Sequence, residues 1–385
     1  MGQTVINAGA SNVPKKWAGV LFNATVADSF FLTNMTDNSR SVDNDGEMAN
    51  APVVVLNHLE KSAGEDVHFE VYMQVSGNPT YGDDTLEGNE TDLESFSDEI
   101  RINQVRKAVS AGGRMTQKRT ETNLRNMAKV KLSEYFSKYV DQVHFTNLAG
   151  ARGINADYEL PLGVDYAIPK THKFSEYDAD HKLYGGNATS KATLTATDTM
   201  KLTTIERALT KAKAEGGGSD MKIRLDPLKL DGQKNAFIVL MHTYQAHDLR
   251  ADVGTKGWFE IQKALTTAEG KKSQIFSGAL GWHQGACLKE HKDVVRFNDF
   301  GAGKNVQGAR AAIMGRQALV TAFGNAASKG KMRMGWEEEW KDYKNKLSVA
   351  TGMIFNVKRP EFDGKTYGSF AIDTAHTSGT AEIIN

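Results

Sequence analysis

His283 and Cys287 are the residues of this chain whose types come nearest to a catalytic pair. They are four positions apart, so on a helix the imidazole could take the thiol proton and leave a thiolate nucleophile. No neighbouring residue supplies a group that would orient the imidazole, as the third member of a triad does. A packed cysteine beside a surface histidine is therefore the favoured interpretation.

Motifs for metal ions and phosphate groups are incomplete. Asp43–Gly46 imitates part of a calcium loop, but Ser41 and Pro52 stand where the first ligand and the bidentate glutamate belong. His242 and His247 are five positions apart, which does not place two zinc ligands on one helical face. No glycine-rich phosphate loop or nucleophile elbow occurs. We therefore expect no catalytic residues, no cofactor and no metal ion.

An aromatic group near the C-terminus has the spacing of a helix. Trp336, Trp340 and Tyr343 recur at helical intervals beside the acidic run 337–339. A ligand cage is one interpretation, but core packing with a solvated acidic edge is favoured.

Composition sets broad limits on the class of protein. The chain has 385 residues, with 47 Lys and Arg balanced by 47 Asp and Glu, and a mean hydropathy of −0.46. Zero net charge argues against a general nucleic-acid coat, and no apolar run is long enough for a membrane span. The single cysteine excludes an internal disulfide and a Cys-rich metal site. We expect a soluble, intracellular product with more than one folding unit.

The elements that would position functional residues are strands and helices from distant parts of the chain. Alternation over 67–75 and again over 96–102, with a Gly-rich turn between, predicts an extended hairpin. Helical spacing without Gly or Pro predicts one long helix from about 115 to 149, capped by Thr116 or Thr120 and stopped by Gly150.

Further elements complete an α+β pattern. Helices are expected at 202–212, with Asp198 as a cap, and at 307–323. Strands are expected at 236–241, which is continuously apolar, at 349–357 and at 367–372.

Charge is balanced over the chain but separated along it. The stretch 62–100 holds eleven acids and no Lys or Arg, whereas 101–131 holds nine bases and one acid, Glu121. Adjoining blocks of opposite sign indicate surfaces that meet a partner, although a solvated loop followed by a basic helix is the simpler alternative.

The stretch from hairpin tip to long helix resembles the major capsid proteins of tailed bacterial viruses. The matching residues are the tip Glu87–Glu90, the return strand with Ile102, Val105 and Arg106, and the helix start with Gly113, Met115 and Arg119. Similar segments follow in the same order at 237–252, 275–291, 309–324 and 336–345.

The resemblance implies the Hong Kong 97-type capsid fold, of α+β class. Its parts would be an N-terminal arm (1–60), an E-loop hairpin (61–112) and a peripheral domain with a long spine helix (113–200). An axial domain with connecting strands (201–330) and a C-terminal return into the peripheral domain (331–385) would follow.

The implied function is a major capsid protein that self-assembles into the icosahedral shell around the double-stranded DNA of a tailed bacteriophage. Its expected partners are copies of itself in hexamers and pentamers, a separate scaffolding protein, a portal protein and a decoration or cement protein. DNA would be a neighbour only by proximity, no membrane is involved, and the location is the virion, assembled in the bacterial cytoplasm. The alternatives are an encapsulin-like compartment and a soluble α+β enzyme.

By analogy the acidic hairpin would lie over the neighbouring subunit, near that subunit's basic spine segment. The expected inter-subunit contact residues are Asp83, Asp84, Glu87, Glu90, Asp92, Arg106, Arg114, Lys118 and Arg119. Since 62–100 holds no Lys, the Lys–Asn cross-link of the fold's namesake is not expected, and a shell of this chain should dissociate to monomers in hot detergent.

Overall fold

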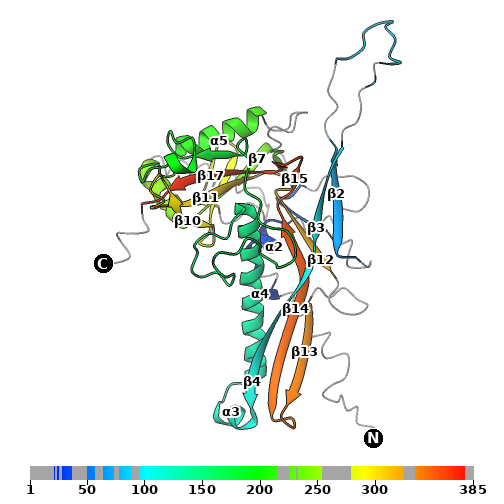
Figure 1. Ribbon diagram of the computed structural model, residues 1–385, viewed down its shortest axis with the longest axis vertical. Helices are drawn as coiled ribbons and strands as arrows, with labels where there is room; N and C mark the ends of the chain where they lie inside the picture. The colour runs from blue at the N-terminus through cyan, green and yellow to red at the C-terminus, as the bar shows by residue number, and fades with distance from the viewer. Residues whose placement is uncertain are drawn as a thin grey trace.

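The computed structural model describes residues 21, 24–25, 28–36, 50–56, 64–72, 78–88, 90, 95–215, 225–230, 233–253, 279–324 and 334–377. Figure 1 shows an elongated molecule in which a two-stranded ribbon leaves the body at one end. A short helix, α3 (Arg114–Arg119), lies at the opposite end, and α4 (Leu124–Ala149) runs along the body between them. No helix in the described ranges is long and apolar enough to cross a membrane.

The first sheet lies beside α4 and is built on one long strand, β14. Its strands are β1 (Val53–Leu56), β4 (Asn103–Gly113), β12 (Leu319–Gly324), β13 (Met334–Lys341) and β14 (Lys346–Lys358). Strand β4 pairs antiparallel with one side of β14, while β13 and β12 pair with successive parts of the other side. The alternation that predicted a strand at 349–357 is confirmed, and its buried side chains face the core.

Helix α4 has defined ends, and it is buried on every side from Tyr139 to Thr146. The Asn123 side chain accepts hydrogen bonds from the amides of Arg125 and Asn126, and Gly150 ends the helix in the left-handed region at φ 67°. The predicted stop at Gly150 is thus confirmed. The prediction of one helix from residue 115 is wrong, because Thr120–Asn123 are not helical and Asn123 caps a new helix.

The second sheet forms the core of the other part of the body. Its strands are β5 (Lys182–Tyr184), β6 (Leu228–Leu230), β7 (Gln233–Met241), β8 (Gly281–His283), β9 (Ala286–Glu290), β10 (Arg296–Phe300), β11 (Val306–Met314) and β17 (Ser369–Ala375). Helix α5 (Leu202–Glu215) packs on it through Ile205 and Leu209. Residues 236–241 are buried throughout, as the continuous apolar run predicted.

The C-terminal part of the chain serves both sheets. Strands β13 and β14 belong to the first sheet, whereas β17 pairs antiparallel with β11 and parallel with β5 in the second. Between them a small hairpin of β15 (Glu361–Phe362) and β16 (Lys365–Thr366) lies near the root of the ribbon. Residues 151–181 have no regular element, and η2 (Lys191–Thr193) is one short turn.

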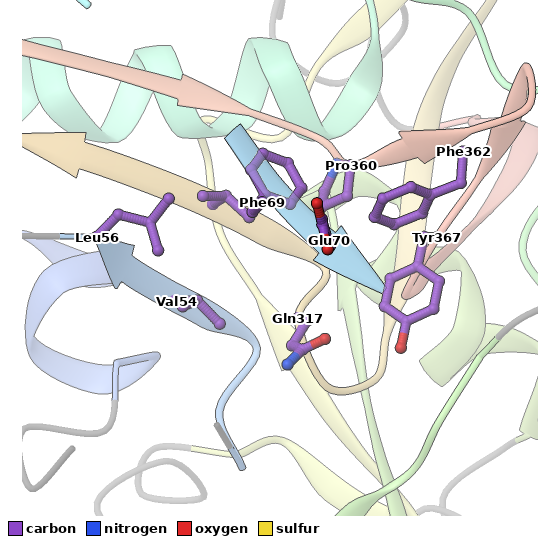
Figure 2. A pocket seen from close by; sticks show the side chains of 9 residues that line it. Val54, Leu56, Phe69, Glu70, Gln317, Pro360, Phe362 and Tyr367 are labelled. Carbon is purple, nitrogen blue, oxygen red and sulfur yellow. The ribbon is translucent and has the colours of Figure 1, made fainter. Parts of the chain in front are cut away.

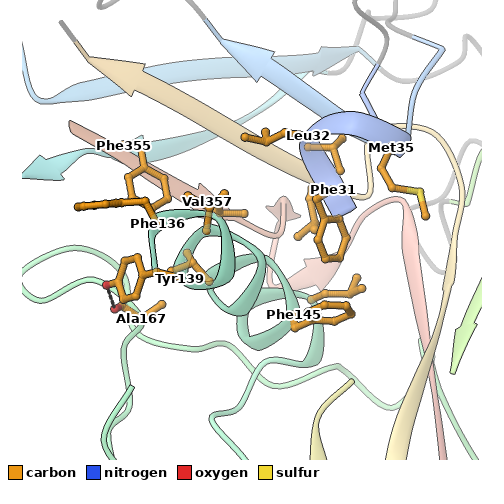
Figure 3. Close-up of a cluster of buried hydrophobic side chains, with 14 of the residues drawn as sticks. Phe31, Leu32, Met35, Phe136, Tyr139, Phe145, Ala167, Phe355 and Val357 are labelled. Carbon is orange, nitrogen blue, oxygen red and sulfur yellow. Dashed lines mark hydrogen bonds between the residues drawn. The ribbon is translucent and has the colours of Figure 1, made fainter. Parts of the chain in front are cut away.

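The N-terminal segment docks on α4 through a short helix, α2 (Phe30–Asn34). The buried Asp141 carboxylate accepts from the Ser29 hydroxyl at 2.7 Å and from the amides of Phe30 and Phe31 at 2.9 and 3.2 Å. Figure 3 shows Phe31, Leu32 and Met35 directed into the core, with Phe31 beside Phe145. A carboxylate and two aromatic rings thus fix this segment to the long helix.

Two further predictions of local structure are wrong. Residues 307–323 form β11 and β12, separated by a turn, rather than a helix. The alanines of β11 favour a helix by propensity, but here they are small side chains in closely packed strands. A Cβ on the neighbouring Gly308 would lie 2.4 Å from the Thr374 carbonyl oxygen.

The predicted cap of α5 is the other error. The Asp198 side chain closes the turn at 195–198 instead of capping α5.

The helical placement of two residue groups is wrong, whereas the favoured interpretation of Cys287 as a packed cysteine is confirmed. His283 ends β8 and Cys287 lies in β9, where it pairs with Trp282; the thiol is buried and the imidazole contacts Glu206 at 2.9 Å. Trp336 and Trp340 lie on strand β13, and Tyr343 lies in the turn that follows. Trp336 is buried in the core, and Tyr343 is fully exposed.

A buried ion pair between two strands of the second sheet is joined to the end of α4. The Arg310 guanidinium donates to both Asp373 oxygens at 2.7 and 2.8 Å and to the Ala149 carbonyl at 2.7 Å. Burial disfavours the charged guanidinium, but the Asp373 carboxylate outweighs that effect and raises the pKa of Arg310 above its ordinary value. The cation is fully satisfied only while all these partners are present.

Replacing Asp373 with Asn should destabilise the subunit by about 3–5 kcal/mol, because it leaves a buried cation without its counter-charge. Denaturant unfolding of unassembled subunits measures the change. Asp299→Asn is the matched control: it breaks the more exposed Lys191–Asp299 pair and should cost about 0–1 kcal/mol. Equal effects of the two substitutions would contradict the role given to the buried pair.

Two neighbouring residues of α4 should give opposite contributions to the pH dependence of stability. Burial lowers the pKa of His144 to about 4, so between pH 4 and 6.5 the unfolded chain binds more protons and stability falls as pH falls. Burial raises the pKa of Asp141 to about 6, so between pH 3.8 and 6 the folded chain holds the extra proton and stability rises as pH falls.

His144→Gln should therefore reduce the loss of stability on acidification from pH 7 to 4.5, by up to about 3 kcal/mol, and Asp141→Asn should increase it. Urea unfolding at both pH values measures these slopes. If the two variants shift the slope in the same direction, the assignment is wrong.

Candidate inter-subunit contact site

The acidic part of the chain forms the predicted hairpin. Strands β2 (Asp66–Tyr72) and β3 (Ser95–Arg101) pair antiparallel from Asp66↔Arg101 to Tyr72↔Ser95. They form a sheet of their own, and only Ile102 separates β3 from β4 of the first sheet. A ribbon of two strands has little stability by itself, so its root must be held by the body.

The root of the ribbon is held by apolar packing and by a carboxylate. Val67 and Ile100 are buried against Val54, Val320 and Ala322 of the first sheet. Asp98 accepts a hydrogen bond from the Lys358 ammonium group and another, at 3.0 Å, from the Glu361 amide. These contacts fix the direction in which the ribbon leaves the body.

An apolar cavity of about 100 Å³ lies beside this root. Its lining comes from β1, β2, β12, β15 and the segments next to them: Val54, Leu56, Phe69, Glu70, Gln317, Val320, Pro360, Phe362 and Tyr367. Figure 2 shows Phe69 and Phe362 on either side of Pro360, with Glu70 between Phe69 and Tyr367. A single carboxylate among apolar groups offers no pair for acid–base catalysis.

Asp98→Asn should loosen the ribbon and cost about 1–3 kcal/mol, because the largely buried Lys358 loses its anionic partner. Hydrogen exchange of the β2 and β3 amides should become faster. The neighbouring Glu99, whose side chain is 48% exposed, supplies the control: Glu99→Gln should leave exchange unchanged. Slow exchange that survives Asp98→Asn would contradict the anchoring role of Asp98.

The tip of the ribbon is acidic and exposed. Asp83, Asp84 and Glu87 lie on the surface, and no salt bridge between described residues involves them. The Glu90 carboxylate accepts a hydrogen bond from the Gly88 amide at 2.7 Å, which closes the turn. Asp92 lies outside the described residues. At the root, Asp66 pairs with Arg101 and Asp98 pairs with Lys358, whereas the described acids of the tip face solvent.

The predicted basic residues follow one line along the molecule. Arg106 is exposed on the face of β4 opposite α4, while Lys107 of the same strand contacts the Tyr135 ring of α4. Arg114, Lys118 and Arg119 are exposed together on α3. Arg106 lies about 25 Å from α3 along the extended strand. The four bases form no salt bridge with another described residue.

Within one subunit the acidic and basic groups do not meet. Figure 1 places the ribbon tip at one end of the molecule and α3 at the other. The pairing of Asp98 with Lys358 at the ribbon root could not be predicted from the sequence, because the two residues are 260 positions apart and no local pattern links them. It also placed the beginning of the basic helix too early, although an Asn followed by a helical run is a recognisable cap.

Only some of the residues first considered for chemistry lie in the described part of the chain. Among the described residues, no group of three or more His, Cys, Asp or Glu is placed to hold a metal ion. Asp43–Gly46 lies outside the described residues. His242 is buried beside Tyr244, and burial lowers its pKa to about 3, so its ring is neutral at ordinary pH.

The fold defines a viral capsid protein of the Hong Kong 97 type. It combines a long helix beside one sheet, a two-stranded ribbon that leaves the body, and a second sheet of parallel and antiparallel strands. Comparison with known proteins agrees. The capsid of Ralstonia phage GP4 superimposes with a TM-score of 0.81 and 38% identity, over 99% of this chain and 100% of that one. The capsid of cyanophage Pam1 has the same fold, with a TM-score of 0.64 and 16% identity, over 98% and 100%.

Sequence comparison leads to the same family. The phage capsid protein family matches residues 6–378. The major capsid protein of Pseudomonas phage KPP25 is 26% identical over 83% of this chain and 86% of its own length. The chain belongs to the phage capsid protein family, and it is a major capsid protein and a virion component. The resemblance drawn from the sequence is thus confirmed.

Proposed function

We propose that the chain forms hexamers and pentamers of an icosahedral head shell in which the acidic ribbon tip of each subunit lies over the basic end of its neighbour. The observation that supports this most is the placement of opposite charges at opposite ends of one elongated molecule. Such charges cannot neutralise each other within a subunit, but they can between subunits arranged head to tail. Contacts of this kind are heterologous, and they close into rings when the rotation allows.

The finer division of the chain is part of this proposal. Residues 1–60 act as an arm, 61–112 as the E-loop and 113–200 with 331–385 as the peripheral domain, with 201–330 as the axial domain. Strand β4 begins inside the E-loop range, so that range includes both the free ribbon and its fixed continuation. The last segment serves both domains through β14 and β17.

The expected partners follow from the proposed role. A separate scaffolding protein, a portal protein and a decoration or cement protein would act on this shell, and double-stranded DNA would be enclosed by it. Assembly would take place in the bacterial cytoplasm, and the chain would have no catalytic activity. Family membership favours this function over an encapsulin-like compartment or a soluble enzyme.

Reversing Asp83, Asp84 and Glu87 to Lys should block or misdirect assembly while the subunit stays folded, because three repulsive contacts replace three attractive ones. Single exposed pairs contribute only about 0–1 kcal/mol, so each single reversal should be mild. Negative-stain microscopy of the expressed protein and circular dichroism measure the two outcomes.

Two further variants make this test specific. Reversing Asp157 and Glu215, which are exposed outside the ribbon, should leave assembly normal. Adding Arg114→Glu, Lys118→Glu and Arg119→Glu to the tip reversal should restore shells, since the charges are then exchanged. Normal shells from the tip reversal alone would refute the charge contact.

A further inference from the structure

Large apolar side chains are exposed at both ends of the molecule. On the ribbon tip, Tyr81 is 72% exposed and Leu86 is 63% exposed. At the other end, in the first two turns of α4, Met127 is 44% exposed and Val130 is 51% exposed. Apolar groups of this size, grouped and rimmed by charge, are typical of a surface that another protein covers.

The tip presents its apolar pair inside an acidic rim. Tyr81 and Leu86 bracket Asp83 and Asp84 in the chain, and Glu87 follows directly. All five are exposed. An apolar centre with a charged rim is the usual arrangement of a protein–protein contact.

The outward face of α4 presents the matching arrangement. Met127 and Val130 are three positions apart, so they are neighbours on the helix surface, away from the buried side that carries Leu132. Lys131 lies next to them and pairs with Glu134 at 2.8 Å, and the three bases of α3 come just before them in the chain. The excess of positive charge at this end therefore comes from α3, whereas the tip is acidic.

A second exposed aromatic pair fits the tip less well. Trp340 and Tyr343 lie at the turn between β13 and β14 and are 46% and 103% exposed. Their surroundings carry both signs, with Glu339 and Asp342 among the lysines 341, 344 and 346. Three lysines against two acids give this turn a smaller excess of positive charge than α3, which carries three bases and no acid, so the turn attracts an acidic surface less.

We propose that Tyr81 and Leu86 of one subunit pack against Met127 and Val130 of the next copy of this chain. The inference rests on the proposed head-to-tail assembly and names its central contact. Apolar burial supplies the affinity, and the opposite charges around it set the register and exclude other surfaces. The acidic residues predicted from the sequence thus form the rim of the contact and not its centre.

Paired cysteines test which surface receives the tip. Cys287 is buried and leaves the introduced pairs free to react alone. Particles carrying Leu86→Cys with Val130→Cys, once oxidised, should run on a denaturing gel as a ladder of multimers that reducing agent collapses to one band. Leu86→Cys with Leu162→Cys, an exposed site outside both patches, should stay monomeric. Monomers from the Val130 pair, or a ladder from Leu86→Cys with Tyr343→Cys, would overturn the proposal.

A second measurement tests the source of the affinity. Tyr81→Ser with Leu86→Ser keeps every charge and should raise the subunit concentration needed for assembly about tenfold or more, with an unchanged circular dichroism spectrum. Leu162→Ser is the control and should assemble as the wild type does. Assembly of the double variant at the wild-type concentration would refute the apolar contact while leaving the capsid function intact. Failure of the wild-type chain to form any shell would instead refute the proposed function, and this contact with it.

Discussion

A two-stranded ribbon cannot bury both of its faces, and this constraint governs how the subunit is used. Within the described part of the chain, the body holds the ribbon at its root, through Val67, Ile100 and the Asp98–Lys358 pair. Beyond the root, the tip exposes both charge and large apolar groups. An element of this kind is stable when another surface covers it, so the completed structure of the subunit includes its neighbour.

The body provides the rigid support that such a contact requires. Two of its buried charges have partners at short distances: Arg310 with Asp373 of the same sheet and with Ala149 of α4, and Asp141 with the first amides of α2. Among the described residues, Asp83, Asp84 and Glu87 at one end and Arg114, Lys118 and Arg119 at the other form no salt bridge within the subunit. This division separates folding from assembly, because the charges that stabilise the monomer are different from those available to a partner.

The sequence was sufficient for elements whose patterns are local. Alternation found β2, β3 and β14, a continuous apolar run found β7, and Gly150 marked the end of α4. Runs of small residues were misleading: the alanines of β11 suit a helix by propensity, but close packing beside Gly308 requires small side chains in a strand. Contacts such as Asp98–Lys358 join distant parts of the chain and leave no local pattern. The charge blocks were visible in the sequence, whereas their separation to opposite ends became apparent only in the fold.

The central claim is that the ribbon tip binds the neighbouring subunit at α3 and the beginning of α4. A cryo-electron microscopy reconstruction of the assembled particle tests it most directly, since it locates residues 78–88 relative to every adjacent copy. The account predicts that Tyr81 and Leu86 lie within contact distance of Met127 and Val130 of the next subunit, inside a ring of opposite charges. A tip that lies on its own subunit, or that projects from the shell without touching a neighbour, would contradict it.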